Sequence, residues 1–210
     1  MNLNLGDTKL IIEEAKKHGL SLHELAYVLA TAYHETAHTM KPVREYGGEK
    51  YLKSKKYYPY VGMGYVQLTW KTNYEKASKK FGVDFVAHPK LLLEPKYAAP
   101  ILVVGMKEGW FTGKSLKSYI DDLDEPDKED LREFANARRI INGTDKQVEI
   151  GYLALEYEKL LKDAAYGIPV PVETPTEPVQ EVPKVEAPVV VEKKETLLDF
   201  VIKLLKVVFK

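Results

Sequence analysis

Apolar and polar positions follow a helical period over most of the first 165 residues. Capping-box patterns at Ser21 and Thr144 indicate helix starts, and several amphipathic stretches are followed by glycine. Helices are predicted over residues 8–18, 21–38, 73–81, 96–108, 129–141 and 144–166. The pattern therefore predicts a mainly α-helical domain over residues 1–165.

One segment departs from the helical pattern. Residues 57–70 are rich in aromatic and β-branched side chains, which is typical of a small β element. If residues 64–70 form a strand, its period of two sorts the side chains into two sets. One face carries Tyr65, Gln67 and Thr69, and the other carries Val66, Leu68 and Trp70. We expect the second set to enter the core and the first to line a cleft for a polar ligand.

The composition excludes several classes of protein. The chain has 210 residues, no cysteine, and 31 basic against 31 acidic side chains. A disulfide scaffold and a zinc site built on thiolates are therefore excluded. No apolar run approaches the roughly 20 residues of a membrane span, and the first residues show no secretory signal. The near-neutral charge gives no reason to expect nucleic acid as a partner, and we expect synthesis in the cytoplasm without a signal peptide.

The charge is distributed unequally along the chain. Residues 166–192 are acidic and interleave proline with valine, which predicts an extended linker. Residues 193–210 place their lysines in one narrow helical stripe and are otherwise apolar, which predicts a cationic amphipathic helix. A helix over residues 196–210 is too short to span a bilayer, so we expect it to lie on an anionic membrane surface. Folding back onto the domain or self-association is the alternative.

Candidate chemistry begins in residues 31–48. Glu35 continues an apolar helical stripe, so its carboxyl group is expected at the interior edge, where burial raises the pKa. Glu45 follows Pro42 among polar neighbours and should remain ionised. Two carboxyl groups in such unlike surroundings are what glycoside hydrolysis requires. A solvated or helix-capping charge is the alternative for Glu35.

The same segment spells HExxH through His34, Glu35 and His38, the order found in zinc peptidases. Two histidines four residues apart on a helix share a face and could chelate a metal. No third ligand follows at a suitable place, so we prefer hydrogen-bonding roles for both histidines and expect no metal or cofactor. A zinc peptidase stays open as the alternative enzyme.

Acidic residues are dense in residues 121–130, where seven of ten positions are Asp or Glu. The spacing does not follow the EF-hand loop, and no central glycine allows its turn. We expect a solvated acidic loop and no metal site there.

Several motifs together resemble phage endolysins of glycoside hydrolase family 19, which have a lysozyme-like chitinase fold. The resemblance covers about residues 20–165. The matching blocks are His34-Glu35-Thr36, Glu45, residues 62–70 (GMGYVQLTW), Asn73-Tyr74 and residues 138–143 (RRIING).

The resemblance implies a role for each matched residue. Glu35 matches the general acid and Glu45 the general base of an inverting hydrolysis, so their carboxyl groups should lie about 6.5–9.5 Å apart. Thr69 matches the residue that places the attacking water. Gln67, Asn73 and Asn142 match amides that contact N-acetyl sugars. We also expect His34, Tyr65 and Arg138 to line the substrate cleft.

Two positions depart from the family pattern. Met63 stands where the family usually has arginine, and Glu49 lies close enough to Glu45 to be a second candidate for the base. The family cleaves chitin or the β-1,4 glycan of peptidoglycan, and a chain without disulfides or export signal fits the lytic phage branch. We therefore expect a monomeric endolysin whose partner is peptidoglycan. A wall-binding or membrane-binding protein without catalysis is the remaining alternative.

Overall fold

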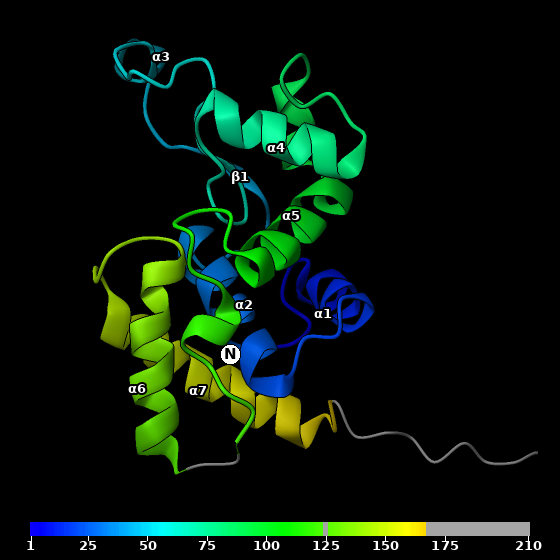
Figure 1. Cartoon of the computed structure of the whole chain (residues 1–210), viewed down its shortest axis with the longest axis vertical. Helices are drawn as coiled ribbons and strands as arrows, with labels where there is room; N and C mark the ends of the chain where they lie inside the picture. Colours follow the sequence, from blue (N-terminus) through cyan, green and yellow to red (C-terminus); the bar gives the residue numbers. More distant parts are fainter. Residues whose placement is uncertain (124–125, 167–210) are drawn as a thin grey trace, which may run out of the picture. The chain divides into compact units, whose positions relative to one another are not determined.

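The computed structural model describes residues 1–123 and 126–166, which belong to one compact unit of the chain. This part is mainly helical with one small antiparallel sheet (Figure 1), as predicted. None of its helices is long and apolar enough to cross a bilayer. Apart from Tyr166, the predicted linker (166–192) and amphipathic helix (193–210) lie outside the described residues.

The helices largely follow the predicted ranges. They are α1 (Thr8–Lys17), α2 (Leu22–Glu35), α3 (Glu49–Lys53), α4 (Lys71–Phe81), α5 (Pro95–Glu108), α6 (Asp127–Ala137) and α7 (Gln147–Asp163). Short 3-10 turns are η1 (Pro89–Leu93), η2 (Leu116–Ser118) and η3 (Arg138–Ile140). The helix α3 and the first two of these turns were not predicted, because segments this short carry little periodic signal.

The helix ends show where local sequence rules succeed and fail. The capping box at Ser21 and Glu24 forms as predicted, and Gly82 ends α4 in the left-handed conformation. The predicted box at Thr144 is wrong, since α7 begins after Lys146 without a side-chain cap. The helix α2 ends at Glu35 and not at His38, because the chain leaves the helix at Thr36, whose hydroxyl accepts a hydrogen bond from the Met40 amide.

The predicted seven-residue strand is mostly a turn. The strand β1 (Val43–Arg44) pairs antiparallel with β2 (Met63–Gly64), and a bridge between Met63 and Leu68 closes a tight loop. Residues 57–70, which contain β2 and this loop, are called the hairpin below. Gly64 and Gln67 both have positive φ, so the side chains between them do not alternate between two faces. The prediction that Trp70 enters the core is therefore wrong; its side chain is 49% exposed.

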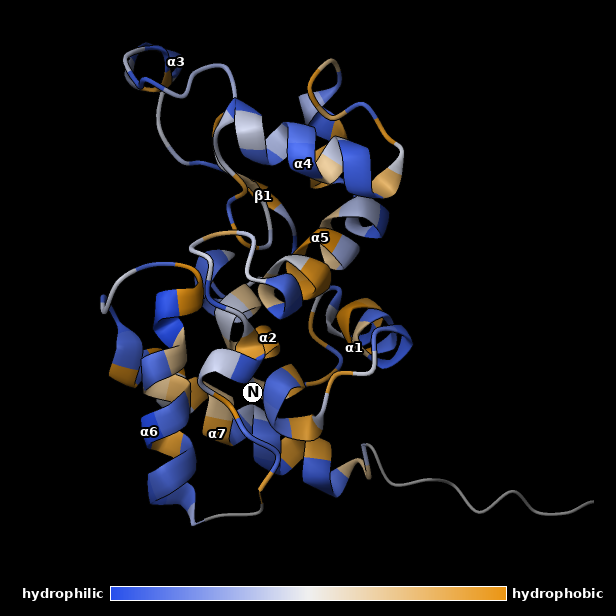
Figure 2. Cartoon of the chain, in the orientation of Figure 1, coloured by the Kyte–Doolittle hydropathy of each residue, from blue (hydrophilic) through white to orange (hydrophobic). Residues whose placement is uncertain are grey.

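Among the described residues, the core consists of two apolar clusters, and α5 contributes side chains to both. The larger one lies among α1, α2, α5, α6 and α7, and the smaller one joins the hairpin, α4, η1 and α5. Leu102 and Val103 belong to the first cluster, whereas Ile101 and Val104 belong to the second. Figure 1 shows α5 between α4 and the group formed by α2, α6 and α7, and Figure 2 shows how apolar α5 is compared with α6. This helix therefore links the two clusters, together with Tyr65 and Val66 of the hairpin, which pack in the larger one.

The hairpin is tied to the N-terminal segment by a partly buried hydrogen bond. The Tyr65 hydroxyl donates to Asp7 Oδ2 at 2.7 Å, and Lys41 Nζ contacts Asp7 Oδ1 at 2.5 Å. Burial and the Asp7 carboxylate raise the pKa of Tyr65 well above its usual value, so the hydroxyl keeps its proton. Three segments distant in sequence therefore meet at Asp7.

Tyr65→Phe is expected to lower the free energy of unfolding by about 2 kcal/mol, because a partly buried hydrogen bond to a charged group is lost. Urea denaturation measures this change. Tyr152→Phe, which alters an exposed tyrosine of α7, is the matched control and should leave stability nearly unchanged. Equal stability of the two variants would show that the Tyr65–Asp7 bond contributes nothing.

Candidate active site

Glu35, the last residue of α2, is held by an arginine more than one hundred positions later in the chain. Arg138 Nη1 donates to Glu35 Oε1 at 2.7 Å, and Arg138 Nε donates to the backbone carbonyl of Asp145 at 3.0 Å. The arginine is only 3% exposed. Its two contacts fix the guanidinium between η3 and the following loop, so it can position the Glu35 carboxylate.

The buried position of Arg138 corrects one expectation. The sequence suggested that Arg138 contacts substrate, but its guanidinium is enclosed and directed at Glu35 and Asp145. Its role in this geometry is to position Glu35. Asn142 lies four residues later on the surface, and its Oδ1 accepts a hydrogen bond from the Gly143 amide. Asn142 is thus exposed, and it is close in sequence to Arg138.

The two histidines beside Glu35 do not share a helix face. Because α2 ends at Glu35 and His38 has a φ of 67°, the i and i+4 geometry that HExxH needs is absent from the described residues. The His38 ring stacks on Tyr33 with centroids 4.4 Å apart. His34 Nδ1 lies 4.0 Å from Glu149 Oε1. The geometry gives both histidines packing or polar contacts and does not favour the zinc-peptidase alternative.

Glu45 is bound by the hairpin through both carboxylate oxygens. Oε1 accepts from the Tyr57 hydroxyl at 2.6 Å, and Oε2 accepts from the Gly62 amide at 3.0 Å. The Glu45 amide also donates to the Gly62 carbonyl at 2.7 Å. The bond to Glu45 raises the pKa of Tyr57 to about 12. This is the hydrogen-bond pattern of an ionised carboxylate held in a fixed orientation, since each of its oxygens serves as an acceptor.

Glu49 has a different environment from Glu45. It begins α3, is exposed, and pairs with Arg44 Nη2 at 2.9 Å. An exposed ion pair of this kind orients a carboxylate weakly. Between the two candidates for the base, the geometry favours Glu45. Met63 has its side chain buried in the smaller core cluster.

Three of the expected polar residues lie together where the hairpin leads into α4. Thr69 Oγ1 donates to the Gln67 carbonyl at 2.7 Å, and Asn73 Nδ2 donates to the Thr69 carbonyl at 2.8 Å. Gln67 Nε2 donates to the carbonyls of Val43 and Gly64 at 3.0 and 3.3 Å. Gln67 thus braces the hairpin against β1 with its amide group, while Thr69 and Asn73 keep partly exposed side chains.

Tyr65 does not belong to this group. The sequence placed it beside Gln67 and Thr69 on the cleft-facing side of a strand, but its side chain is only 1% exposed and its hydroxyl bonds to Asp7. The reason is the turn after Gly64, which removes the alternation on which that expectation depended. Tyr65 is therefore a core residue, and its side chain does not lie on an accessible surface.

Trp70 was expected in the core, but it lies on the surface. Its exposed ring packs edge-on against Tyr57 with centroids 5.5 Å apart, and Tyr57 in turn bonds to Glu45. Tyr46 and Tyr51, on either side of the Glu49 position, are also exposed. Exposed aromatic rings beside a carboxylate are suited to stack on the apolar faces of sugar rings.

The structure therefore arranges the expected residues in two groups. The first group lies at the end of α2 and in or just after η3, and contains His34, Glu35, Arg138 and Asn142. The second lies beside β1 and in the segment that leads into α4, and contains Glu45, Gln67, Thr69 and Asn73. Sequence reasoning missed the Gly62 amide and Tyr57 as partners of Glu45. Tyr57 and Gly62 lie 12 and 17 residues after Glu45, in an irregular segment where no periodic pattern predicts a contact.

Comparison of the chain with protein-family models, with curated proteins and with solved structures finds no match.

Proposed function

We propose that this chain is a lysozyme-like glycoside hydrolase that cleaves the β-1,4 glycan of bacterial peptidoglycan with inversion, in the manner of a phage endolysin. The observation that carries the proposal is the contrast between its two carboxylates. Glu35 is held by a buried guanidinium, and Glu45 by a tyrosine hydroxyl and a backbone amide. The order of motifs that resembles glycoside hydrolase family 19 supports the same assignment.

In this mechanism Glu35 protonates the leaving oxygen of the glycosidic bond. Arg138 occupies Oε1 of Glu35, so Oε2 is the oxygen that would carry the transferred proton. An inverting general acid gives up its proton in each cleavage, so Glu35 must be protonated again before the next one. The guanidinium keeps the carboxyl group in one place while that proton is exchanged.

Glu45 accepts a proton from the attacking water on the opposite side of the sugar. Its two hydrogen bonds fix the carboxylate before substrate arrives, and Thr69 supplies a hydroxyl from the adjoining segment. The exposed Trp70 ring offers a surface for a sugar ring near this base. The roles of acid and base thus fall on two parts of the fold.

The test is the chemistry of the products released from purified peptidoglycan. We expect new reducing sugar ends, with the anomeric configuration at C1 inverted when it is first detected by NMR, and no new amino groups from stem peptides. Release of stem-peptide amino groups without reducing ends would overturn the proposal in favour of a peptidase. Binding to the wall without either product would indicate a protein without catalysis.

Tyr57→Phe is expected to reduce kcat about tenfold with little change in KM, because a hydrogen bond worth roughly 1.4 kcal/mol no longer orients the base. Kinetics on soluble glycan oligomers separate the two constants. Tyr58→Phe, which alters the next tyrosine, is the matched control and should retain the wild-type kcat. A Tyr57→Phe enzyme with unchanged kcat would remove Tyr57 from the mechanism.

A further inference from the structure

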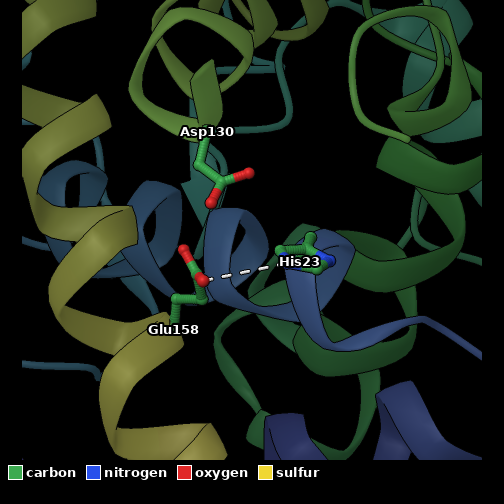
Figure 3. Close-up of side chains that lie close together, drawn as sticks. All are labelled: His23, Asp130 and Glu158. Atoms are coloured by element: carbon green, nitrogen blue, oxygen red, sulfur yellow. Dashed lines mark ion pairs between the residues drawn. The ribbon is translucent and has the colours of Figure 1, made fainter. Parts of the chain in front are cut away.

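A second cluster of ionisable side chains lies inside the helical half of the molecule. His23 belongs to the first turn of α2, Asp130 to the start of α6, and Glu158 to the middle of α7. Each offers one potential ligand atom, and these atoms lie within 4.8 Å of one another. Figure 3 shows the three side chains converging from three helices.

The members of this cluster are almost completely removed from solvent. His23 is 8% exposed, Asp130 4% and Glu158 3%. The expectation of a solvated acidic loop across residues 121–130 is therefore wrong for Asp130, which α6 directs against α7. Carboxylates are seldom buried to this extent unless they are paired or bind a metal.

Each of the three also leaves a buried polar atom without a hydrogen-bond partner among the described residues. These atoms are His23 Nε2, Asp130 Oδ2 and Glu158 Oε2. Buried polar atoms are nearly always satisfied, because an unmet group costs about 1–3 kcal/mol. Three such atoms belong to one cluster, whose potential ligand atoms are close enough together to contact a single bound ion.

The cluster brings two carboxylates together with few cationic groups. Lys162 Nζ lies 2.6 Å from Glu158 Oε1, and His23 Nε2 lies 3.7 Å from the same oxygen. Burial, together with the charge of Glu158, raises the pKa of Asp130 to about 6. The two buried carboxylates thus lie near one lysine and one imidazole, and both of these contacts are made at the same oxygen of Glu158.

We propose that His23, Asp130 and Glu158 form a binding site for a divalent transition-metal ion, with zinc as the ion that fits best. Zinc binds imidazole nitrogen and carboxylate oxygen, and an open zinc site has three protein ligands with the fourth position left to water. Calcium needs six to eight oxygen ligands and magnesium prefers oxygen throughout, so neither suits a three-ligand site with a histidine. Closing the cluster around zinc requires only small side-chain shifts, because its ligand atoms are already near one another.

The ion has a route to the site. His23 lines an open cavity of about 550 Å³, whose other lining residues include Glu24, Lys117 and Tyr166. A dication can therefore reach His23 without unfolding of the domain.

The site acts on stability and not on catalysis. His23 and Glu35 are at opposite ends of α2, and 12 residues of helix separate them by about 18 Å. A metal that binds α2, α6 and α7 together stabilises the folded chain by mass action, because the unfolded chain does not assemble the site. It holds in register the helices that present Glu35 and Arg138.

The experiment uses the full chain, stripped of metal by a chelator and then titrated with zinc chloride. We expect one zinc per chain by mass spectrometry, a rise of the melting temperature by several degrees, and no such rise with calcium or magnesium. Cobalt provides a second measurement on the unaltered chain, since a site of this kind gives it the visible absorption of four-coordinate Co²⁺.

Variants show whether the buried cluster is the site. His23→Asn should remove both the bound zinc and the rise in melting temperature, whereas His88→Asn, which removes an exposed histidine, should change neither. Zinc binding that persists in a folded His23→Asn protein would assign the metal to surface groups and overturn the proposal. So would the absence of zinc and of the cobalt spectrum from the wild-type chain, which would mean that the three groups share protons only.

Discussion

Glu35→Gln is expected to reduce glycan cleavage by about 10²–10⁴-fold, the range for loss of a general acid. Glutamine keeps the size of the side chain and can still accept the Arg138 hydrogen bond through its amide oxygen. It cannot deliver a proton to the leaving oxygen. The fold should therefore persist while the chemical step fails.

Release of reducing ends from peptidoglycan measures this loss, with thermal unfolding as the check on folding. Glu13→Gln, a change to an exposed glutamate of α1, is the matched control and should cleave like wild type. A substrate with an activated aryl leaving group needs little protonation, so Glu35→Gln should cleave it far better than it cleaves natural glycan. Full activity of Glu35→Gln on peptidoglycan would rule out Glu35 as the acid.

Glu45→Gln is expected to produce a loss of similar size, about 10²–10⁴-fold, for a different reason. The amide cannot accept a proton from water, and its NH₂ group would face a hydrogen-bond donor, either Tyr57 or the Gly62 amide. An activated leaving group should not restore this variant, because the missing step is the attack of water. The two variants are thus distinguished by one substrate.

Glu49→Gln is the comparison that separates the two candidates for the base. It breaks an exposed ion pair with Arg44, which contributes little to stability or position. We expect nearly wild-type cleavage from this variant under the conditions in which Glu45→Gln is inactive. The reverse result would transfer the role of base to Glu49.

The helices could be predicted from the sequence because their rules are local. The capping box at Ser21 and the glycine after Phe81 place helix ends within a few residues. The hairpin could not be predicted in the same way, because a period of two over residues 64–70 is compatible with a strand and with a turn. Whether this segment forms a turn depends on positive φ at Gly64 and Gln67 and on the pairing of β2 with β1, which lies some 20 residues earlier.

In the candidate site, too, local sequence patterns predict some features, whereas contacts between distant residues determine others. Glu35 and Glu45 could be singled out from helix period and from motif order, but their partners could not. Arg138 reaches Glu35 across 103 positions, and Tyr57 reaches Glu45 only because the hairpin folds back. The burial of Asp130 was hidden for a related reason. It ends a mostly acidic segment in which Asp121, Asp122 and Asp127 are exposed, whereas its neighbours in space are on α2 and α7.

The shared helix α5 has a consequence for how the described part of the molecule loses its structure. Ile101 and Leu102 are adjacent in the chain, yet they pack into different clusters. If either cluster melted, α5 would lose packing on one side and weaken the other. The halves that carry Glu35 and Glu45 are therefore expected to denature cooperatively, in one calorimetric transition, so that acid and base disappear at the same temperature.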